Sequence, residues 1–362
     1  MKKIRVGIIG QGRSGRDIHD HSCRDVVPDK YQVVAVADPL EDRCRRAEEE
    51  FGYITYTDYR EMLKRDDLDL IVNASPSHLH VPITMEVLEA GFNVLTEKPL
   101  ARKAADVDML IRKAESTGKL FAVYQQSRFA PYFRQVNEVI DSGLLGRIVM
   151  VKIAFNGFAR RWDWQTLQEM DGGNLLNTGP HPLDQALHFV GRDAMPEVLC
   201  IMDRANTFGN AEDHVKLIMH RQDKPTVDLE ISSCCAYPSY TYQVYGTRGG
   251  LTGNMTHIDW KYFNPEEAPH QELAREPLPG PGYCGEQLPW REDSWDVSEE
   301  DANLFNAMAG RFYNNLYDAL VNGAPLVVTP QQVRQQIAVI EECHRQNSLD
   351  RHTIAQHEAA VV

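Results

Sequence analysis

Short apolar runs alternate with helical patterns through the first 125 residues, and this alternation restricts the possible fold more than any other feature. The strand-like runs are rich in β-branched residues and occupy 4–9, 31–38, 68–74, 93–96 and 120–124. The helical patterns between them cover 14–24, 41–51, 82–90 and 104–117. Apolar strands separated by helices are typical of a parallel sheet that is covered on both faces. Because crossovers between parallel strands are right-handed, these residues predict a doubly wound α/β domain of the Rossmann type.

The pattern changes after residue 125. A helical stretch at 132–141 is followed by strand-like runs with mostly no helices between them, at 148–155, 198–203, 214–220, 226–232, 240–245 and 250–255. Short links favour antiparallel pairing, so we expect an α+β domain with a mainly antiparallel sheet. Residues 264–300 are rich in Pro, Gly and acidic side chains and predict a long surface excursion, followed by helices at 301–321 and 330–346. The chain is therefore expected to form two domains, 1–125 and 126–362.

Composition and charge limit the partners of such a chain. Its 362 residues suffice for two domains of about 150 residues each. With 52 acidic against 38 basic residues the formal net charge is −14, which disfavours nucleic acids and anionic membranes as partners. The apolar run at 6–9 is too short for a signal peptide, and no run approaches the roughly 20 residues of a membrane span. The seven scattered cysteines contain no C-x-x-C pair and predict free thiols in a cytoplasmic protein.

A glycine-rich loop follows the first strand and opens the first helix. It reads Gly10-Gln11-Gly12-Arg13-Ser14-Gly15, which is the G-x-G-x-x-G spacing of dinucleotide-binding loops. Gly10 permits a tight turn, Gly12 lets the backbone approach a pyrophosphate, and Gly15 allows the helix to pack closely on the strand. A glycine turn with a purely structural role is the alternative, but the strand–turn–helix context favours a nucleotide site.

The second strand ends in Asp38, whose carboxylate can accept hydrogen bonds from both hydroxyls of an adenosine ribose. Its charge would repel the 2′-phosphate of NADP, and Pro39-Leu40 rather than an arginine follows it directly. We therefore predict NAD as the cofactor, with NADP as the less favoured alternative.

Two further segments follow parallel strands, at the sheet edge where ligands bind in open α/β folds. The first contains Ser75, Pro76 and His80. It can serve a phosphate or a ribose, or it can be a helix cap with a proline turn. Two His-x-His pairs in the chain lack a third ligand at a metal-binding spacing, so no metal is expected.

The second of these segments is Glu97-Lys98-Pro99. Pro99 disfavours helical geometry at Lys98, so the lysine is held extended at the rim of the sheet. A surface lysine beside a turn is the competing interpretation.

Residues 172–184 carry the most specific pattern of the second half. Asn177, His181 and Asp184 are spaced i, i+4 and i+7, on one face if the stretch is helical, although Gly179-Pro180 can distort its middle. A neutral imidazole is suited to removing a hydroxyl proton near pH 7. A solvated helix face with a chance histidine is the alternative.

These motifs together resemble the Gfo/Idh/MocA family, named after glucose-fructose oxidoreductase, inositol dehydrogenase and the rhizopine-catabolism protein. The resemblance rests on Gly10–Gly15, Asp38, the turn at 75–80, Glu97-Lys98-Pro99 and the segment 172–184, and it covers nearly the whole chain, including the order of the two halves.

The resemblance implies that Lys98 and His181 flank the nicotinamide as catalytic residues. Family members usually carry Asp where this chain has Asn177. An amide cannot accept a proton at neutral pH, so Asn177 would position a substrate hydroxyl while His181 takes the proton. Asp184 would orient or assist His181.

The same resemblance extends the predicted site. The cofactor-binding set is Gly10, Gln11, Gly12, Arg13, Ser14, Gly15, Asp38, Ser75, Pro76, His80, Glu97, Lys98 and Gln125. The substrate-binding set is Asn177, Asp184, Arg128, Arg160 and Trp162. Arg160 and Trp162 can supply a hydrogen-bond donor and an aromatic wall for a sugar, or belong to a loop with ordinary surface packing. The 264–300 excursion and the Trp162 loop are both expected to be able to shape the substrate pocket.

The implied activity is that of an NAD-dependent dehydrogenase that oxidises a secondary hydroxyl of a sugar, an inositol-like polyol or a glycoside, for example at C3, to a ketone. Two alternatives stay open, namely an NAD-dependent glycoside hydrolase that works by transient oxidation and elimination, and a non-catalytic NAD-binding sensor. The resemblance also implies a homo-oligomer, a dimer or tetramer, formed through an open face of the second sheet.

Overall fold

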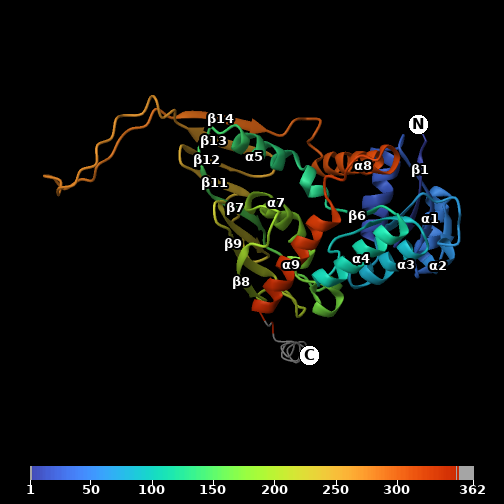
Figure 1. Ribbon diagram of the computed structural model, residues 1–362. Coiled ribbons are helices and arrows are strands. Elements are labelled where there is room, and N and C mark those ends of the chain that lie inside the picture. Colours follow the sequence, from blue (N-terminus) through green and yellow to red (C-terminus); the bar gives the residue numbers. More distant parts are fainter. Residues whose placement is uncertain (1, 348, 350–362) are drawn as a thin grey trace.

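The computed structural model describes residues 2–347 and 349 (Figure 1). Its N-terminal half is built on a six-stranded parallel sheet in the order β3-β2-β1-β4-β5-β6. The strands are β1 (Ile4–Ile9), β2 (Tyr31–Ala37), β3 (Ile54–Tyr56), β4 (Leu70–Asn73), β5 (Asn93–Thr96) and β6 (Phe121–Val123). This is the strand order of doubly wound dinucleotide-binding folds, with the topological switch point between β1 and β4. The predicted fold class of this half is confirmed.

Two short elements of this half escape the sequence patterns. Strand β3 is three residues long and pairs with β2, and helix α2 (Tyr59–Met62) is a single turn. Elements this short contain too few residues for a periodic signal. The helix predicted at 14–24 is present, but it winds as the π-helical segments η1 (Arg13–Asp20) and η2 (Ser22–Val26).

Helices cover both faces of this sheet, and one of them comes from the far end of the chain. One face carries α2, α3 (His80–Glu89) and α4 (Ala104–Thr117), with the short η3 (Ser77–Leu79) before α3. The other face carries η1, η2, α1 (Glu41–Phe51) and α8 (Leu304–Asn322). On α8, Phe312, Tyr313 and Leu316 are buried in one core with Val6 and Ile8 of β1. The predicted helix near 301–321 thus completes the core of the first half (Figure 1).

The second half contains an eight-stranded sheet in the order β14-β13-β12-β11-β7-β10-β9-β8. Its strands are β7 (Ile148–Asn156), β8 (Glu197–Asp203), β9 (His214–His220), β10 (Thr226–Ser232), β11 (Tyr242–Gly246), β12 (Gly249–Gly253), β13 (His257–Tyr262) and β14 (Arg291–Asp296). Neighbouring strands are antiparallel except for β7 and β10, which are parallel. The predicted mainly antiparallel sheet is confirmed.

Helices pack on one face of this second sheet. They are α5 (Pro131–Asp141), α7 (Pro180–Val190) and α9 (Pro330–Gln346), and shorter turns lie at η4 (Gln126–Phe129), η5 (Trp164–Thr166), η6 (Gln168–Met170) and α6 (Asn174–Asn177). Helix α9 also contacts α4, so it links the two halves. Among the described residues, no helix is both long and apolar enough to cross a membrane.

The opposite face of the second sheet is open, and a long arm projects from its edge. On β8, Leu199 is 60% exposed and Ile201 is 58% exposed. The excursion predicted at 264–300 is only partly correct, because its last part forms β14, which pairs along β13. The residues between these two strands extend far from the body, away from the N-terminal half (Figure 1). This direction corrects the expectation that the excursion shapes the pocket of its own chain.

Candidate active site

The glycine loop lies at the carboxyl end of β1, beside the switch point. Gly10 has φ +95°, and a Cβ there would lie 2.4 Å from the carbonyl oxygen of Ala74. A Cβ at Gly15 would lie 1.8 Å from the carbonyl oxygen of Gly10, so packing inside the protein requires both glycines. A Cβ at Gly12 would meet the Arg43 guanidinium at 3.5 Å and no other described residue within 4 Å. The backbone at Gly12 is therefore open to an approaching group.

Asp38 is held at the end of β2 by backbone groups. Its Oδ2 accepts a hydrogen bond from the backbone N–H of Gln11 at 2.7 Å, and its Oδ1 accepts one from that of Leu40 at 3.0 Å. The Nη1 atom of Arg43 lies 3.1 Å from Oδ2. No arginine directly follows Asp38 in the sequence, but the first turn of α1 brings Arg43 back to the strand end, which the sequence pattern did not predict.

His80 ties two strand-end loops together and is 2% exposed. Its Nδ1 lies 2.6 Å from the carbonyl oxygen of Pro99, and its Nε2 lies 2.9 Å from that of Ser75. Burial lowers the pKa of His80, although these carbonyls oppose the shift. His80 therefore shapes the cofactor side of the sheet through the Ser75-Pro76 turn and Pro99. No group of three or more His, Cys, Asp or Glu residues that could hold a metal occurs in the described part of the chain.

Glu97 anchors the segment that carries Lys98. Its Oε2 accepts a hydrogen bond from the backbone N–H of Lys98 at 3.0 Å, and its Oε1 lies 3.1 Å from Nε2 of His19. Nδ1 of His19 lies in turn 2.7 Å from the Tyr313 hydroxyl on α8. Burial raises the pKa of Glu97, but the hydrogen bond with His19 and the charges of His19 and Lys98 outweigh it and lower the pKa to about 2. Glu97 is thus a buried anion that positions Lys98.

Lys98 and His181 come from different halves of the chain and lie close enough for the Lys98 charge to act on the imidazole. Nζ of Lys98, at the end of β5, donates a hydrogen bond to the backbone carbonyl of Asn177 at 2.9 Å. His181 lies in the first turn of α7, and its Nδ1 lies 3.1 Å from the hydroxyl of Ser127. Both catalytic candidates are partly exposed. With Nδ1 engaged, Nε2 is the ring nitrogen of His181 that can face a substrate.

The surroundings of this pair favour an uncharged imidazole. Burial lowers the pKa of His181, and the Lys98 ammonium lowers it further, to about 3. Burial also lowers the pKa of Lys98, with help from the charges of Arg13 and Arg161, while Glu97 opposes the shift. An imidazole with this pKa is neutral throughout the physiological pH range and can accept a proton there.

The segment 172–184 is not one continuous helix. Helix α6 ends at Asn177, and α7 begins at Pro180. Pro180 has no N–H to continue the ladder, and a Cβ at Gly179 would lie 2.2 Å from the carbonyl oxygen of Leu175. Gly179-Pro180 thus interrupts the stretch, as its sequence allowed, and the single face that a continuous helix would give Asn177, His181 and Asp184 does not apply.

Asp184 faces two arginines instead of His181. Its carboxylate accepts hydrogen bonds from Nε and Nη2 of Arg128 at 2.7 and 2.6 Å, and from Nη2 of Arg192 at 2.8 Å. Burial raises the pKa of Asp184, but the two arginines outweigh it and hold the pKa below its ordinary value. Within 2–347 and 349, no hydrogen bond joins Asp184 to His181. Asp184 and Arg128 thus lock α7 to η4, which corrects the predicted role of Asp184 as a partner of His181.

The loop after β7 places two further candidates on the surface. Trp162 is 81% exposed, and Arg160 is exposed beside it. The intervening Arg161 forms an ion pair with Asp163 at 2.8 Å. Because the charge of Arg161 acts on Lys98, this loop lies close to that lysine.

A dinucleotide fits these residues. The backbone at Gly12 is open, and Asp38 stands at the end of the neighbouring strand. Gln125, at the end of β6, donates through Nε2 to the carbonyl of Pro180, while its buried Oε1 has no hydrogen-bond partner among the described residues. When bound, the nicotinamide ring supplies the hydride acceptor.

Residues far away in the sequence support the segment 172–184, and no sequence signal identifies them. Glu212 is 2% exposed, and its Oε1 accepts a hydrogen bond from the backbone N–H of Leu175 at 3.0 Å. Gly173 has φ +107°, and a Cβ there would lie 2.4 Å from the same oxygen. Burial raises the pKa of Glu212 to about 7. Glu212 bonds to Leu175 and Ser127 bonds to His181. Both partners are too far away in the sequence for a periodic pattern to predict the contact.

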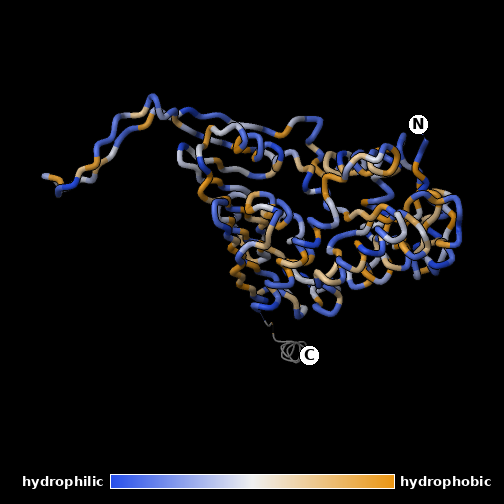
Figure 2. The backbone as a smooth tube through the Cα atoms, viewed as in Figure 1, coloured by the Kyte–Doolittle hydropathy of each residue, from blue (hydrophilic) through white to orange (hydrophobic). Residues whose placement is uncertain are grey.

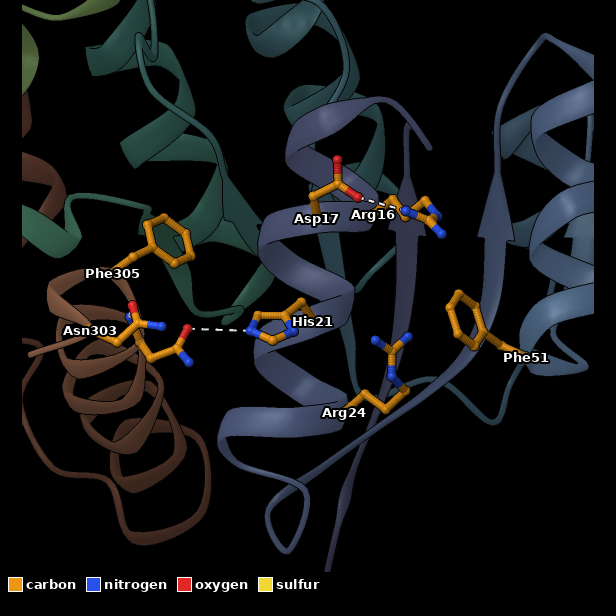
Figure 3. Close-up of a pocket in the computed structure, with 8 residues that line it drawn as sticks. Arg16, Asp17, His21, Arg24, Phe51, Asn303 and Phe305 are labelled. Atoms are coloured by element: carbon orange, nitrogen blue, oxygen red, sulfur yellow. Dashed lines mark hydrogen bonds and ion pairs between the residues drawn. The ribbon is translucent and has the colours of Figure 1, made fainter. Parts of the chain in front are cut away.

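A separate groove lies between η1, η2 and the start of α8 (Figure 3). It is lined by Arg16, Asp17, His21, Arg24, Phe51, Asn303, Phe305 and Asn306. Arg16 pairs with Asp17 at 2.8 Å, and His21 lies 3.3 Å from the side-chain oxygen of Asn306 (Figure 3). The groove shares none of its lining residues with the predicted site.

Family models match both halves of the chain. Residues 4–125 match the model described as an oxidoreductase family with an NAD-binding Rossmann fold, and residues 133–252 match the model of the GFO/IDH/MocA C-terminal domain.

Individual proteins resemble the chain over most of its length. A scyllo-inositol 2-dehydrogenase (NADP(+)) of Bacillus subtilis is 24% identical, covering 98% of this chain and 96% of the relative. A 2,7-anhydro-N-acetylneuraminate hydratase of Mediterraneibacter gnavus is 26% identical, covering 70% and 68%. The structure of the WlbA dehydrogenase from Bordetella pertussis with NADH and UDP-GlcNAcA superposes with a TM-score of 0.74, at 22% identity and 95% coverage of each chain.

Proposed function

Because the chain belongs to the Gfo/Idh/MocA family of NAD-binding oxidoreductases, we propose that it oxidises a secondary hydroxyl of a sugar, polyol or glycoside to a ketone. The hydrogen bond from Lys98, in the first half, to the Asn177 carbonyl, four residues before His181 in the second half, is the observation that carries this proposal. Names of relatives that act on an inositol and on an anhydrosugar acid support the substrate class.

The residues divide the chemistry between them. His181 would accept the hydroxyl proton at Nε2, with Ser127 holding Nδ1, and a bound nicotinamide would supply the acceptor for the hydride that leaves the carbon. Lys98 donates a hydrogen bond to the substrate oxygen and stabilises its developing negative charge. To make this bond, Nζ of Lys98 either gives up its hydrogen bond to the Asn177 carbonyl or uses another of its three hydrogens for the substrate. The Asn177 amide can hold an adjacent hydroxyl but accepts no proton.

NADH formation against a panel of inositols, free sugars and glucosides tests the proposal. We expect NAD-dependent absorbance at the nicotinamide band with at least one member, and a ketone product by mass spectrometry. Bound NAD without turnover across the whole panel would contradict the proposal and favour a sensor.

A second candidate function is a reaction in which the sugar is oxidised only transiently. A leaving group is eliminated or water is added, and the hydride then returns to the sugar. The hydratase relative favours it, because a hydratase causes no net oxidation. The two functions differ in one readout, since the second converts sugar without accumulating NADH.

Cofactor preference is the finer part of the proposal, and Asp38 is proposed to select NAD. For Asp38→Ala we expect the ratio of kcat/KM for NAD to that for NADP to fall at least tenfold. The substitution removes the repulsion of the 2′-phosphate and frees Arg43 to pair with it. Steady-state kinetics with both cofactors measure the ratio.

Asp42→Ala is the matched control, because the Asp42 side chain is 90% exposed on α1, the helix that carries Arg43. An unchanged NAD/NADP ratio in Asp38→Ala, with folding intact by thermal unfolding, would remove Asp38 from cofactor selection.

A cytoplasmic location belongs to the same proposal. The cysteines Cys23, Cys44, Cys200, Cys234, Cys235, Cys284 and Cys343 are free thiols in the structure, which suits a reducing compartment.

A further inference from the structure

The arm at 264–290 is tied to the body of its own chain at its root, where Glu267 pairs with Arg291, and projects away from the body beyond it. Its 27 residues, together with Phe263, connect the end of β13 to the start of β14, and nearly all of them are exposed. Half of such a segment spans roughly 40 Å when extended, at about 3.3 Å per residue. The arm therefore reaches well beyond the body, and its far end is placed to contact another molecule (Figure 1).

The end of the arm carries large apolar and aromatic side chains in water. Tyr283 is 99% exposed and Leu273 is 81% exposed, and Leu278 between them is 40% exposed. Hydrophobic positions recur among polar ones along both limbs (Figure 2). Grouped exposed side chains of this kind mark an interaction site, because burying them is favourable by about 25 cal/mol per Å².

Prolines and side-chain bonds restrict the conformation of the arm before it binds anything. Six prolines, at 265, 269, 277, 279, 281 and 289, restrict its conformations. The side chain of Gln271 donates a hydrogen bond to Glu286 on the opposite limb at 2.8 Å, and Arg291 pairs with Glu267 at the root. A segment that is already extended loses less conformational entropy when it docks.

The charge of the arm restricts the kind of partner. Five glutamates against the single Arg275 give it a net charge of −4. Nucleic acids and anionic lipid surfaces would be repelled. Because the whole chain is also acidic, the arm would bind a second copy through its apolar side chains and not through its charge.

A second copy of this chain presents an apolar surface. The arm leaves from the β13–β14 edge of the eight-stranded sheet, and the open face of that same sheet exposes Leu199, Ile201 and Val149. A two-fold related copy would cover both open faces, and each arm would then run along the other body, so that every contact is made twice. The arm alone has about the 20 to 30 residues that a stable interface uses on each side.

We propose that the arm at 264–290 embraces a second copy of this chain and that Leu273, Leu278 and Tyr283 are buried in the partner. The arm thus belongs to the assembly, and it is independent of the hydride chemistry.

The first test removes the arm and keeps the sheet. Tyr262 pairs with Arg291 at the last rung of the β13–β14 ladder, so an Asn-Gly turn can replace 263–290 and leave a two-residue hairpin. Light scattering after size exclusion, over a range of concentrations, should show the full chain as a dimer or larger. The shortened chain should dissociate at least tenfold more readily. A monomeric full chain, or an unchanged mass of the shortened chain, would overturn the proposal.

A point variant keeps the arm and removes its proposed anchor. Tyr283→Ser should weaken the assembly, whereas Tyr237→Ser should leave it unchanged. Tyr237 is similarly exposed, at 89%, but lies between β10 and β11. Equal masses and equal dissociation for Tyr283→Ser and the parent chain would remove the arm from the interface.

Cys284 gives a direct readout of where the arm lies. It is exposed in the arm, next to Tyr283. A thiol–amine cross-linker applied to a mixture of isotope-labelled and unlabelled chains should yield Cys284–lysine links that join the two isotopes. Links confined to a single chain would contradict the proposal.

Discussion

Lys98→Met is expected to lower kcat about a thousandfold while NAD binding changes little. Methionine keeps the length of the side chain and removes its only charged donor. Loss of one donor to a developing oxyanion typically costs 10²- to 10³-fold in kcat, and Lys98 also supplies a positive charge that lowers the pKa of His181. Single-turnover NADH formation and cofactor titration by fluorescence separate the chemical step from binding.

Lys103→Met is the control, because Lys103 is exposed at the start of α4. Near-wild-type turnover in Lys98→Met, with unfolding unchanged, would remove Lys98 from the chemistry. Loss of NAD binding together with turnover would instead assign the lysine to the cofactor.

His181→Ala is expected to lower kcat by about 10²- to 10⁴-fold, the usual contribution of a general base. Added imidazole should restore part of the rate if Nε2 is the proton acceptor. His220→Ala is the control, since His220 is exposed on β9. Full activity of His181→Ala would show that the proton leaves by another route.

The pH profile of the wild-type enzyme tests the same assignment. An ordinary histidine base would be protonated below about pH 6.5, and kcat/KM would fall there. Because the pKa of His181 is lowered to about 3, its neutral form persists on acidification, and the acid limb from this group should lie below pH 5. The same shift removes stability as the pH falls below 6.5, because the unfolded chain then binds the proton that the folded chain excludes. A limb at pH 6.5 would contradict the lowered pKa of His181.

Several helices, strands and site motifs could be predicted from local features of the sequence. Strands β1 and β5 run over the predicted residues, and α1 and α4 do the same, because each combines a periodic pattern with a clear end signal. Gly118, for example, closes α4 in the left-handed conformation that glycine favours. The glycine loop, Asp38 and the lysine before Pro99 were visible for the same reason.

Long-range partners decided the rest. From the sequence alone, a carboxylate three residues after His181 is a reasonable partner for it. In the structure, Asp184 is instead bound by Arg128 and Arg192. Arg43, which balances Asp38, likewise depends on how α1 packs on β2. A buried charge forms its strongest contacts with whichever opposite charge the packing brings near, and sequence spacing does not encode that choice.

The sequence by itself thus determined the class of each of the two sheets, the glycine loop and the chemical identity of the lysine and the histidine, since these depend on short-range periodicity and on residue type. The tertiary structure alone decided that Lys98 meets the Asn177 carbonyl, that Ser127 rather than Asp184 holds His181, and that α8 closes the first core. Each of these three contacts joins segments that are more than 50 residues apart in the sequence. Chain folding brings such segments together through burial and hydrogen-bond satisfaction over the whole molecule, which no local pattern contains.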